Sequence, residues 1–251
     1  MDIRRYPELT STSTQAAALG DSAAHGTVVV TDCQTAGRGQ RGISWEAEPG
    51  KNLSFSIVLR PKALPPRRQY ELSMVMALAL HDVLERYIPG HAVCVKWPND
   101  IYVDNGKISG TIIECSLGSS GIERAIVGIG ININQTVFVS DAPNPVSVKM
   151  FTGHDYDLEA LLAEFCTAVI DGVDAHCRAI DPSLDAVDDP AAIALLDRYH
   201  ACLWRNDGRP HQWLDIVTGH LFTALIDHVA PDGLLTLRCP SASSLNPATT
   251  P

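Results

Sequence analysis

The side chains best suited to chemistry are cationic, and several of them lie in a glycine-rich segment. Residues 37–42 read Gly-Arg-Gly-Gln-Arg-Gly, which places Arg38 and Arg41 among three glycines. Glycines let backbone N–H groups come close to a bound anion, and arginines add paired donors that fit phosphate or carboxylate. The segment therefore predicts a loop that closes over an anionic ligand.

The same six residues match the G-x-G-x-x-G fingerprint of dinucleotide-binding folds. That fingerprint requires a helix directly after the glycines and an acidic residue at the end of the next strand. Residues 43–50, Ile-Ser-Trp-Glu-Ala-Glu-Pro-Gly, cannot begin a regular helix, and the next predicted strand ends in Arg60. These surroundings disfavour a dinucleotide site, and a plain surface turn is the other alternative to a ligand loop.

Two lysines supply a second cationic signal. Lys96 stands directly before Trp97-Pro98-Asn99-Asp100, and Lys107 follows the turn residues Asn105-Gly106. A lysine beside a hairpin turn is usually only a solvated charge. In a polar connection, the tryptophan ring is poorly solvated and the proline makes the backbone rigid, and a simple connecting loop needs neither residue. This neighbourhood therefore favours a functional role for Lys107.

The elements that position these residues follow from the hydrophobic pattern. Residues 27–33 are rich in β-branched side chains and predict a strand, and residues 53–60 alternate like a strand with one buried face. Residues 66–87 carry an apolar stripe at three- and four-residue steps, which predicts an amphipathic helix. Further strands are expected at residues 92–96, 101–103, 107–115 and 124–133, and further helices from residue 157 and after Asp189-Pro190.

The pattern changes after about residue 203 to short β-like runs separated by turns, at residues 212–217, 221–229 and 233–239. The last eleven residues are mainly Ser, Thr, Pro and Ala without periodicity, which is typical of a frayed end. The sequence therefore predicts a ligand-binding catalytic domain at residues 1–200, a small β domain at 201–240 and a disordered tail at 241–251.

Composition disfavours several classes of protein. The 251 residues include 19 lysines and arginines and 29 aspartates and glutamates, and the net charge of −10 disfavours nucleic acid or an anionic membrane as a partner. No apolar stretch approaches the ~20 residues of a membrane-spanning helix, and no secretory signal is recognisable, so a cytoplasmic globular protein is expected. The seven cysteines and nine histidines lack metal-ligand spacing, and the cysteines are expected to be reduced.

Five segments occur in an order and spacing that resemble one family. They are Ser13-Thr14-Gln15, residues 34–42 with Trp45, residues 96–100, Lys107-Ile108-Ser109-Gly110, and Gly-Ile-Gly-Ile-Asn-Ile-Asn at 128–134. On these segments the chain resembles the biotin protein ligase family, the biotin-[acetyl-CoA-carboxylase] ligases. The resemblance implies an α+β fold, in which a mixed sheet flanked by helices, as in class II synthetases, is followed by a small C-terminal β-barrel-like domain.

The resemblance also implies a role for particular residues. Lys107 and Arg38 would be catalytic. Biotin would be bound by Ser13, Thr14, Gln15, Gln34, Arg38, Gly39, Gln40, Trp45, Lys107 and Gly110, and ATP by Arg38, Arg41, Lys96, Asn99 and Asn132. The chain departs from the family pattern at Gln15, where asparagine is usual, and at Gln40, where many members have arginine.

The reaction that the resemblance implies has two steps. The biotin carboxylate attacks the α-phosphorus of ATP, whose Mg²⁺ has no dedicated protein ligands, and pyrophosphate leaves. A lysine of a biotin carboxyl carrier protein or domain then attacks biotinyl-5'-adenylate and releases AMP. Because every motif lies before residue 135, the C-terminal β domain is expected to serve this transfer more than adenylation. With about 12 residues before Ser13, no N-terminal DNA-binding module is expected, and the oligomeric state, a homodimer included, is left open.

Two other function classes stay open. Lipoate ligases and octanoyl transferases are related in fold and also use a lysine, but residues 37–42 with Trp45 and residues 97–100 favour biotin. A non-catalytic biotin or nucleotide sensor could retain the fold, whereas the presence of Arg38 and Lys107 favours an enzyme. A pyrophosphate exchange assay with biotin discriminates between enzyme and sensor.

Overall fold

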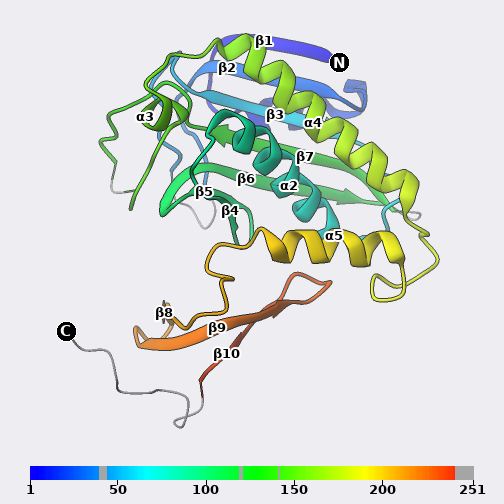
Figure 1. Cartoon of the computed structure of the whole chain (residues 1–251). Helices are drawn as coiled ribbons and strands as arrows, with labels where there is room; N and C mark the ends of the chain where they lie inside the picture. The colour runs from blue at the N-terminus through cyan, green and yellow to red at the C-terminus, as the bar shows by residue number, and fades with distance from the viewer. Residues whose placement is uncertain (40–43, 119–120, 141, 241–251) are drawn as a thin grey trace.

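Two β-sheets and five α-helices make up the computed structural model, which describes residues 1–39, 44–118, 121–140 and 142–240 (Figure 1). The larger sheet has seven strands in the order β1-β2-β3-β7-β6-β5-β4, and the smaller has the order β10-β9-β8. The strands are β1 (Asp2–Leu9), β2 (Thr27–Gln34), β3 (Leu53–Leu59), β4 (Val93–Lys96), β5 (Asp100–Val103), β6 (Gly106–Leu117), β7 (Ile122–Ile131), β8 (His211–Leu214), β9 (Leu221–Val229) and β10 (Leu235–Arg238). The helices are α1 (Thr12–Ala18), α2 (Tyr70–Tyr87), α3 (Val148–Thr152), α4 (Leu158–Ala179) and α5 (Pro190–Ala201).

The larger sheet is mixed, because β1 and β2 are parallel while its other neighbouring strands are antiparallel. Different helices cover its two faces, and Figure 1 shows α2 and α4 lying across one of them. Successive side chains of a strand point to opposite faces. Val28 and Val30 accordingly join the core beneath α2 and α4, whereas Val29 packs with Ala16 of α1. The predicted mixed sheet flanked by helices is confirmed.

Strand β3 is buried on both faces, so the prediction of a single buried face was wrong. Its polar positions, Ser54 and Ser56, are 4% and 0% exposed. Ser56 Oγ donates a hydrogen bond to Thr12 Oγ1 of α1 at 2.8 Å. The alternating pattern predicted one buried face, but α1 also covers the face that carries the serines and supplies polar partners for Ser56.

Two N-terminal elements were not predicted, β1 and α1. Strand β1 lies at the edge of the sheet beside β2 and mixes charged residues with Pro7, so it lacks a buried apolar face. Helix α1 has seven residues, TSTQAAA, which is too short to show an apolar stripe. Both elements are stabilised by neighbours that are distant in the sequence, and this is why local pattern does not reveal them.

The other predicted helices are confirmed, with differences at their ends. Helix α2 begins at Tyr70, after a 3-10 turn at Pro66–Arg68. The Asp157 side chain caps α4 by accepting a hydrogen bond from the Glu159 N–H at 2.9 Å. Asp189 caps α5 in the same way, with Pro190 at the first helical position.

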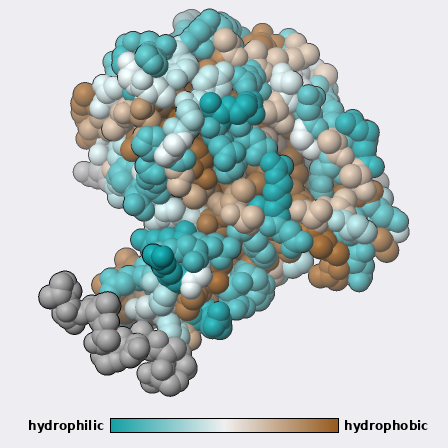
Figure 2. All heavy atoms as spheres, in the orientation of Figure 1, coloured by the Kyte–Doolittle hydropathy of each residue, from teal (hydrophilic) through white to brown (hydrophobic). Residues whose placement is uncertain are grey.

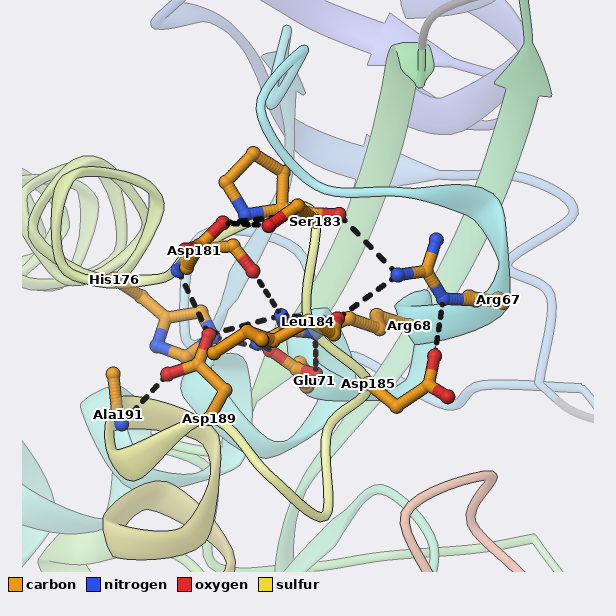
Figure 3. A network of polar contacts seen from close by, with 11 residues as sticks. Arg67, Arg68, Glu71, His176, Asp181, Ser183, Leu184, Asp185, Asp189 and Ala191 are labelled. Atoms are coloured by element: carbon orange, nitrogen blue, oxygen red, sulfur yellow. Dashed lines mark hydrogen bonds and ion pairs between the residues drawn. The ribbon is translucent and has the colours of Figure 1, made fainter.

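A buried ion network joins the start of α2 to the end of α4 and the start of α5 (Figure 3). Arg68, Glu71 and Asp189 are each no more than 1% exposed. Arg68 donates to both carboxylate oxygens of Glu71, to Asp189 Oδ2 at 3.0 Å and to the Asp181 carbonyl at 3.0 Å. His176 Nε2 lies 2.6 Å from Glu71 Oε2. Each buried charge has hydrogen-bonding or oppositely charged partners, and these offset the free energy lost when the charge is removed from water.

We expect this network to make the free energy of unfolding decrease at acidic pH. Burial alone raises the pKa of the Glu71 carboxyl, but hydrogen bonds from His176 and Arg68 outweigh it and hold the pKa below its usual value. A carboxyl whose pKa is lower in the folded chain contributes stability above its unfolded pKa, and loses it as the pH falls through the folded pKa. The urea midpoint should therefore decline from about pH 5 downward, and decline less steeply in Glu71→Gln. Parallel pH profiles for the two proteins would contradict this.

The C-terminal strands form a separate sheet, as predicted, and it is open and antiparallel. In the space-filling view it is a smaller lobe beside the main body (Figure 2). Val229 of β9 is 1% exposed and belongs to the main core. Its N–H donates to His200 Nε2 of α5 at 2.7 Å. The smaller sheet is therefore docked on α5.

The cysteines and the helices bear on whether the protein could use a reactive thiol or span a membrane. All seven cysteines are free thiols, and burial raises the pKa of Cys166 to about 12 and of Cys177 to about 11, so these two are inert at neutral pH. Across the described ranges, no helix combines the length and apolarity needed to cross a membrane.

Candidate functional site

A cavity of about 350 Å³ lies on the sheet face that α1 covers. Its walls come from the start of α1, the glycine-rich segment after β2, the β4–β5 connection, and strands β6 and β7. All five segments singled out in the sequence contribute at least one lining residue. The fold thus brings together residues that are more than 100 positions apart, such as Ser13 and Gly130.

Small residues form the cavity floor. In the sheet register Ser54 pairs with Gly130, which pairs with Gly110, and Ser56 pairs with Gly128. A Cβ atom at Gly130 would clash with the Trp45 ring, and one at Gly128 would clash with Ser13 Oγ. Glycine is required at these two positions because other parts of the site pack directly on the strand backbone.

One end of the cavity is polar and uncharged. Gln34 Oε1 accepts hydrogen bonds from the Thr12 N–H at 2.8 Å and from Thr12 Oγ1 at 3.3 Å. Ser13 Oγ lies 3.1 Å from Ser56 Oγ. Since its oxygen is already engaged, the Gln34 amide group keeps N–H donors for a ligand. Thr12, which the sequence did not single out, therefore orients a predicted ligand residue.

Lys107 marks the charged end. Its Nζ lies 2.8 Å from Asp100 Oδ1 and 5.7 Å from the centre of the Trp45 ring. The Lys107 side chain is 33% exposed, so the ammonium group is oriented yet open to the cavity. Its backbone is fixed by hydrogen bonds to Asn144 O at 2.8 Å and from the Val146 N–H at 3.0 Å.

The described ends of the glycine-rich segment lie side by side at the cavity. Arg38 pairs with Ser44 in an antiparallel bridge, and the Trp45 N–H donates to Gly37 O at 3.0 Å. Arg38 also forms a 3.3 Å ion pair with Glu114. Gln40 and Arg41 lie outside the described residues, so their predicted contacts stay predictions.

The β4–β5 connection supplies the remaining wall. Lys96 Nζ lies 5.1 Å from the centre of the Tyr102 ring. The Asn99 side chain donates to Thr111 O, and the Thr111 N–H donates to Asn99 O at 3.2 Å. These bonds tie the connection to β6, so Lys96 and Asn99 line the cavity as part of a fixed wall.

Three predicted site residues do not line the cavity. Thr14 is exposed on α1, and Gln15 donates to Tyr6 Oη at 3.3 Å. Asn132 is 2% exposed and donates to Val146 O at 3.0 Å. The other predicted residues in the described ranges, Ser13, Gln34, Arg38, Gly39, Trp45, Lys96, Asn99, Lys107 and Gly110, do line it.

The cavity is suited to a ligand that carries an anionic group. Arg38, Lys96 and Lys107 gather there although the chain as a whole carries a net charge of −10. Asp100 and Glu114 each hold one of these cations in place. Nowhere in the described residues do three or more His, Cys, Asp or Glu side chains form a group that could hold a metal ion.

Comparison with known proteins gives several relatives. Residues 6–132 match the biotin/lipoate A/B protein ligase family. A biotin-[acetyl-CoA-carboxylase] ligase of Paracoccus denitrificans is 36% identical over 157 residues, which are 61% of this chain and 65% of the relative. The bifunctional ligase/repressor BirA of Bacillus subtilis is 36% identical over 128 residues, 51% of this chain and 39% of the relative. The aligned residues thus cover less than two thirds of either relative.

The fold is shared with solved structures. The biotin protein ligase of Aquifex aeolicus, in complex with biotin and ATP, matches with a TM-score of 0.73 at 23% identity, covering 94% of this chain and 91% of that one. The ligase of Leishmania major in complex with biotinyl-5-AMP gives a TM-score of 0.64 at 21% identity, covering 95% and 99%. Every residue that lines the cavity falls within the segment matched by the family. The chain belongs to the biotin/lipoate A/B protein ligase family.

Proposed function

We propose that this protein is an ATP-dependent biotin protein ligase, which forms biotinyl-5'-adenylate and transfers the biotinyl group to a lysine of a biotin carboxyl carrier domain. One observation carries the proposal: a single cavity joins a neutral polar end, at Ser13 and Gln34, to a cationic end at Lys107. Biotin has the same polarity, with an uncharged ureido ring at one end and a carboxylate at the other. A site that pairs the ureido donors and acceptor rejects analogues without them.

The proposed first step forms a bond between a biotin carboxylate oxygen and the α-phosphorus of ATP, while the bond to pyrophosphate breaks. These two anionic groups repel each other, and the Lys107 ammonium is placed to lie between them. The ion pair of Arg38 with Glu114 is about half exposed at both side chains, so it is weak and Arg38 can turn to the phosphates. Lys96 adds positive charge from the wall formed by the β4–β5 connection.

In the proposed second step the carrier lysine attacks the acyl carbon of the adenylate, an amide forms, and AMP leaves. The adenylate is a mixed anhydride that water would hydrolyse, so a covered cavity protects it. Mg²⁺ is proposed to enter with ATP and to be held by the phosphates, where it neutralises charge on the leaving pyrophosphate.

The decisive experiment measures transfer of labelled biotin to a purified biotin carboxyl carrier domain, with lipoate as competitor. We expect ATP-dependent label on the carrier that excess lipoate does not suppress. Suppression by lipoate, or preferential transfer of lipoate, would favour the other branch of the family. Binding of biotin without pyrophosphate exchange would indicate a sensor.

Gly128→Ala is expected to raise the KM for biotin about tenfold while leaving the KM for ATP near its normal value. The added Cβ would clash with Ser13 Oγ and break its contact with Ser56. Pyrophosphate exchange at varied biotin and varied ATP measures the two constants separately. Ser13→Ala should produce a similar change in the KM for biotin. An equal rise in both KM values would contradict a ureido role for this end of the cavity.

A further inference from the structure

The smaller sheet touches the cavity wall through its β9–β10 turn. The indole Nε1–H of Trp97, a cavity-lining residue, donates a hydrogen bond to Gly233 O at 2.9 Å. Gly233 is buried and has a φ of +93°, which favours glycine. A Cβ at this position would also clash with the Tyr70 ring of α2. The turn therefore fits tightly between Tyr70 and Trp97.

Helix α5 supports Pro98, the next residue of the same wall. Tyr199 of α5 is fully buried, and its hydroxyl donates to Pro98 O at 3.0 Å. The Tyr199 and Tyr70 hydroxyls are 3.0 Å apart, and the two rings pack edge to face. Trp97 and Pro98 are thus supported from behind by α5 and by the β9–β10 turn.

The turn itself is held in a defined conformation. The Gly233 N–H donates to Ala230 O at 2.8 Å, and the Ala230 N–H donates to Leu234 O at 2.9 Å. One residue earlier, the Val229 N–H is bonded to His200 of α5. Bonds on both sides fix the turn to the main body, so it can act as a rigid support.

We infer that Gly233 and Tyr199 are positioning residues for the cavity wall formed by Trp97 and Pro98, so that the smaller sheet takes part in nucleotide binding. The inference rests on the proposed function, because Trp97 lies between Lys96 and Asn99, the side chains proposed to contact ATP. It differs from the sequence-based expectation that the C-terminal part serves mainly the transfer step.

The test compares Gly233→Ala with Gly219→Ala in the full chain. Gly219 lies between β8 and β9, has a φ of +75°, and a Cβ added there would meet no described atom within 4 Å. Both substitutions therefore impose a similar backbone strain, but only the first forces the turn off Tyr70. We expect Gly233→Ala to raise the KM for ATP in pyrophosphate exchange about tenfold with kcat within about twofold, and Gly219→Ala to leave both unchanged.

Trp97→Phe removes the donor and retains most of the ring. It should raise the KM for ATP about as much as Gly233→Ala does, and the double variant should be no worse than either single variant. Additive effects, or equal effects of Gly233→Ala and Gly219→Ala, would overturn the inference.

A readout without ATP separates this inference from the proposed function. Amide hydrogen exchange in the peptide that spans residues 96–100 should be faster in Gly233→Ala than in the parent and in Gly219→Ala. Unchanged exchange in all three proteins would refute the supporting role. If the parent protein shows no biotin-dependent pyrophosphate exchange, the proposed ligase function is refuted. The hydrogen-exchange result still decides whether Gly233 supports the wall formed by Trp97 and Pro98.

Discussion

Lys107→Ala is expected to lower kcat for biotin-dependent pyrophosphate exchange about a hundredfold, the usual effect of removing one preorganised charge from a developing transition state. Lys107 Nζ is held at the cavity by Asp100, 2.8 Å away, and stands beside Trp45. Its loss leaves the biotin carboxylate and the α-phosphate without a cation between them. Single-turnover formation of the adenylate measures this step without contribution from carrier transfer.

Two further variants sharpen the Lys107 experiment. Lys107→Arg should fail to restore the rate, because a planar guanidinium cannot replace a compact ammonium between two oxygens. Lys149→Ala removes a lysine from α3 whose ion pair with Asp155 lies outside the cavity, and its rate should match that of the parent. A Lys107→Ala protein that releases pyrophosphate at near the parent rate would remove Lys107 from the mechanism.

Arg68→Ala is expected to lower the free energy of unfolding by about 3–5 kcal/mol, because it leaves buried carboxylates without their cation. Glu71 and Asp189 are 0% and 1% exposed, and the guanidinium bonds to both (Figure 3). The neighbouring Arg67 is a matched control, since its side chain is 49% exposed in its ion pair with Asp185. Arg67→Ala should cost about 1 kcal/mol or less. Urea unfolding followed by circular dichroism measures both.

The two arginine variants also distinguish charge burial from simple loss of contacts. Arg68→Ala should recover part of its deficit at acidic pH, because protonation removes the unpaired carboxylate charges. The Arg67→Ala deficit should depend little on pH. Equal losses in the two variants would show that the buried network contributes no more than a surface ion pair.

Local chemistry predicted only part of the cavity, whereas Ser13, Gln34, Trp45 and Gly110 were expected from the family resemblance. Lys107 follows a turn signal, and the glycines of residues 37–42 indicate close approach of the backbone to an anion. The apolar stripe of α2 likewise reflects local periodicity. Local sequence could not show that these residues share one cavity, because the pairing of β3, β7 and β6 decides which glycines lie side by side.

The features that sequence did not reveal depend on contacts between distant residues. Thr12 lies in a helix too short to show a pattern, and its role comes from Gln34 and Ser56. The contact of Gly233 with Trp97 joins residues 136 positions apart, and nothing near either residue indicates it. Thr14 and Gln15 share a segment with Ser13, but the helical turn directs them away from the cavity.

The position of β3 beside β7, the central strand of the larger sheet, has a consequence for folding kinetics. Strand β3 pairs with β7, with Leu53 opposite Ile131, and between them the chain must form α2 and the β4–β5–β6 hairpins. Pairing across such a long loop carries a large closure entropy and slows the rate-limiting step. The cavity is lined by Gly128 and Gly130 of β7, and this same pairing fixes that strand in the sheet. Refolding should therefore restore ligand binding in the slow phase that completes the sheet, and a chain still emerging from the ribosome cannot bind its ligands before β7 is available.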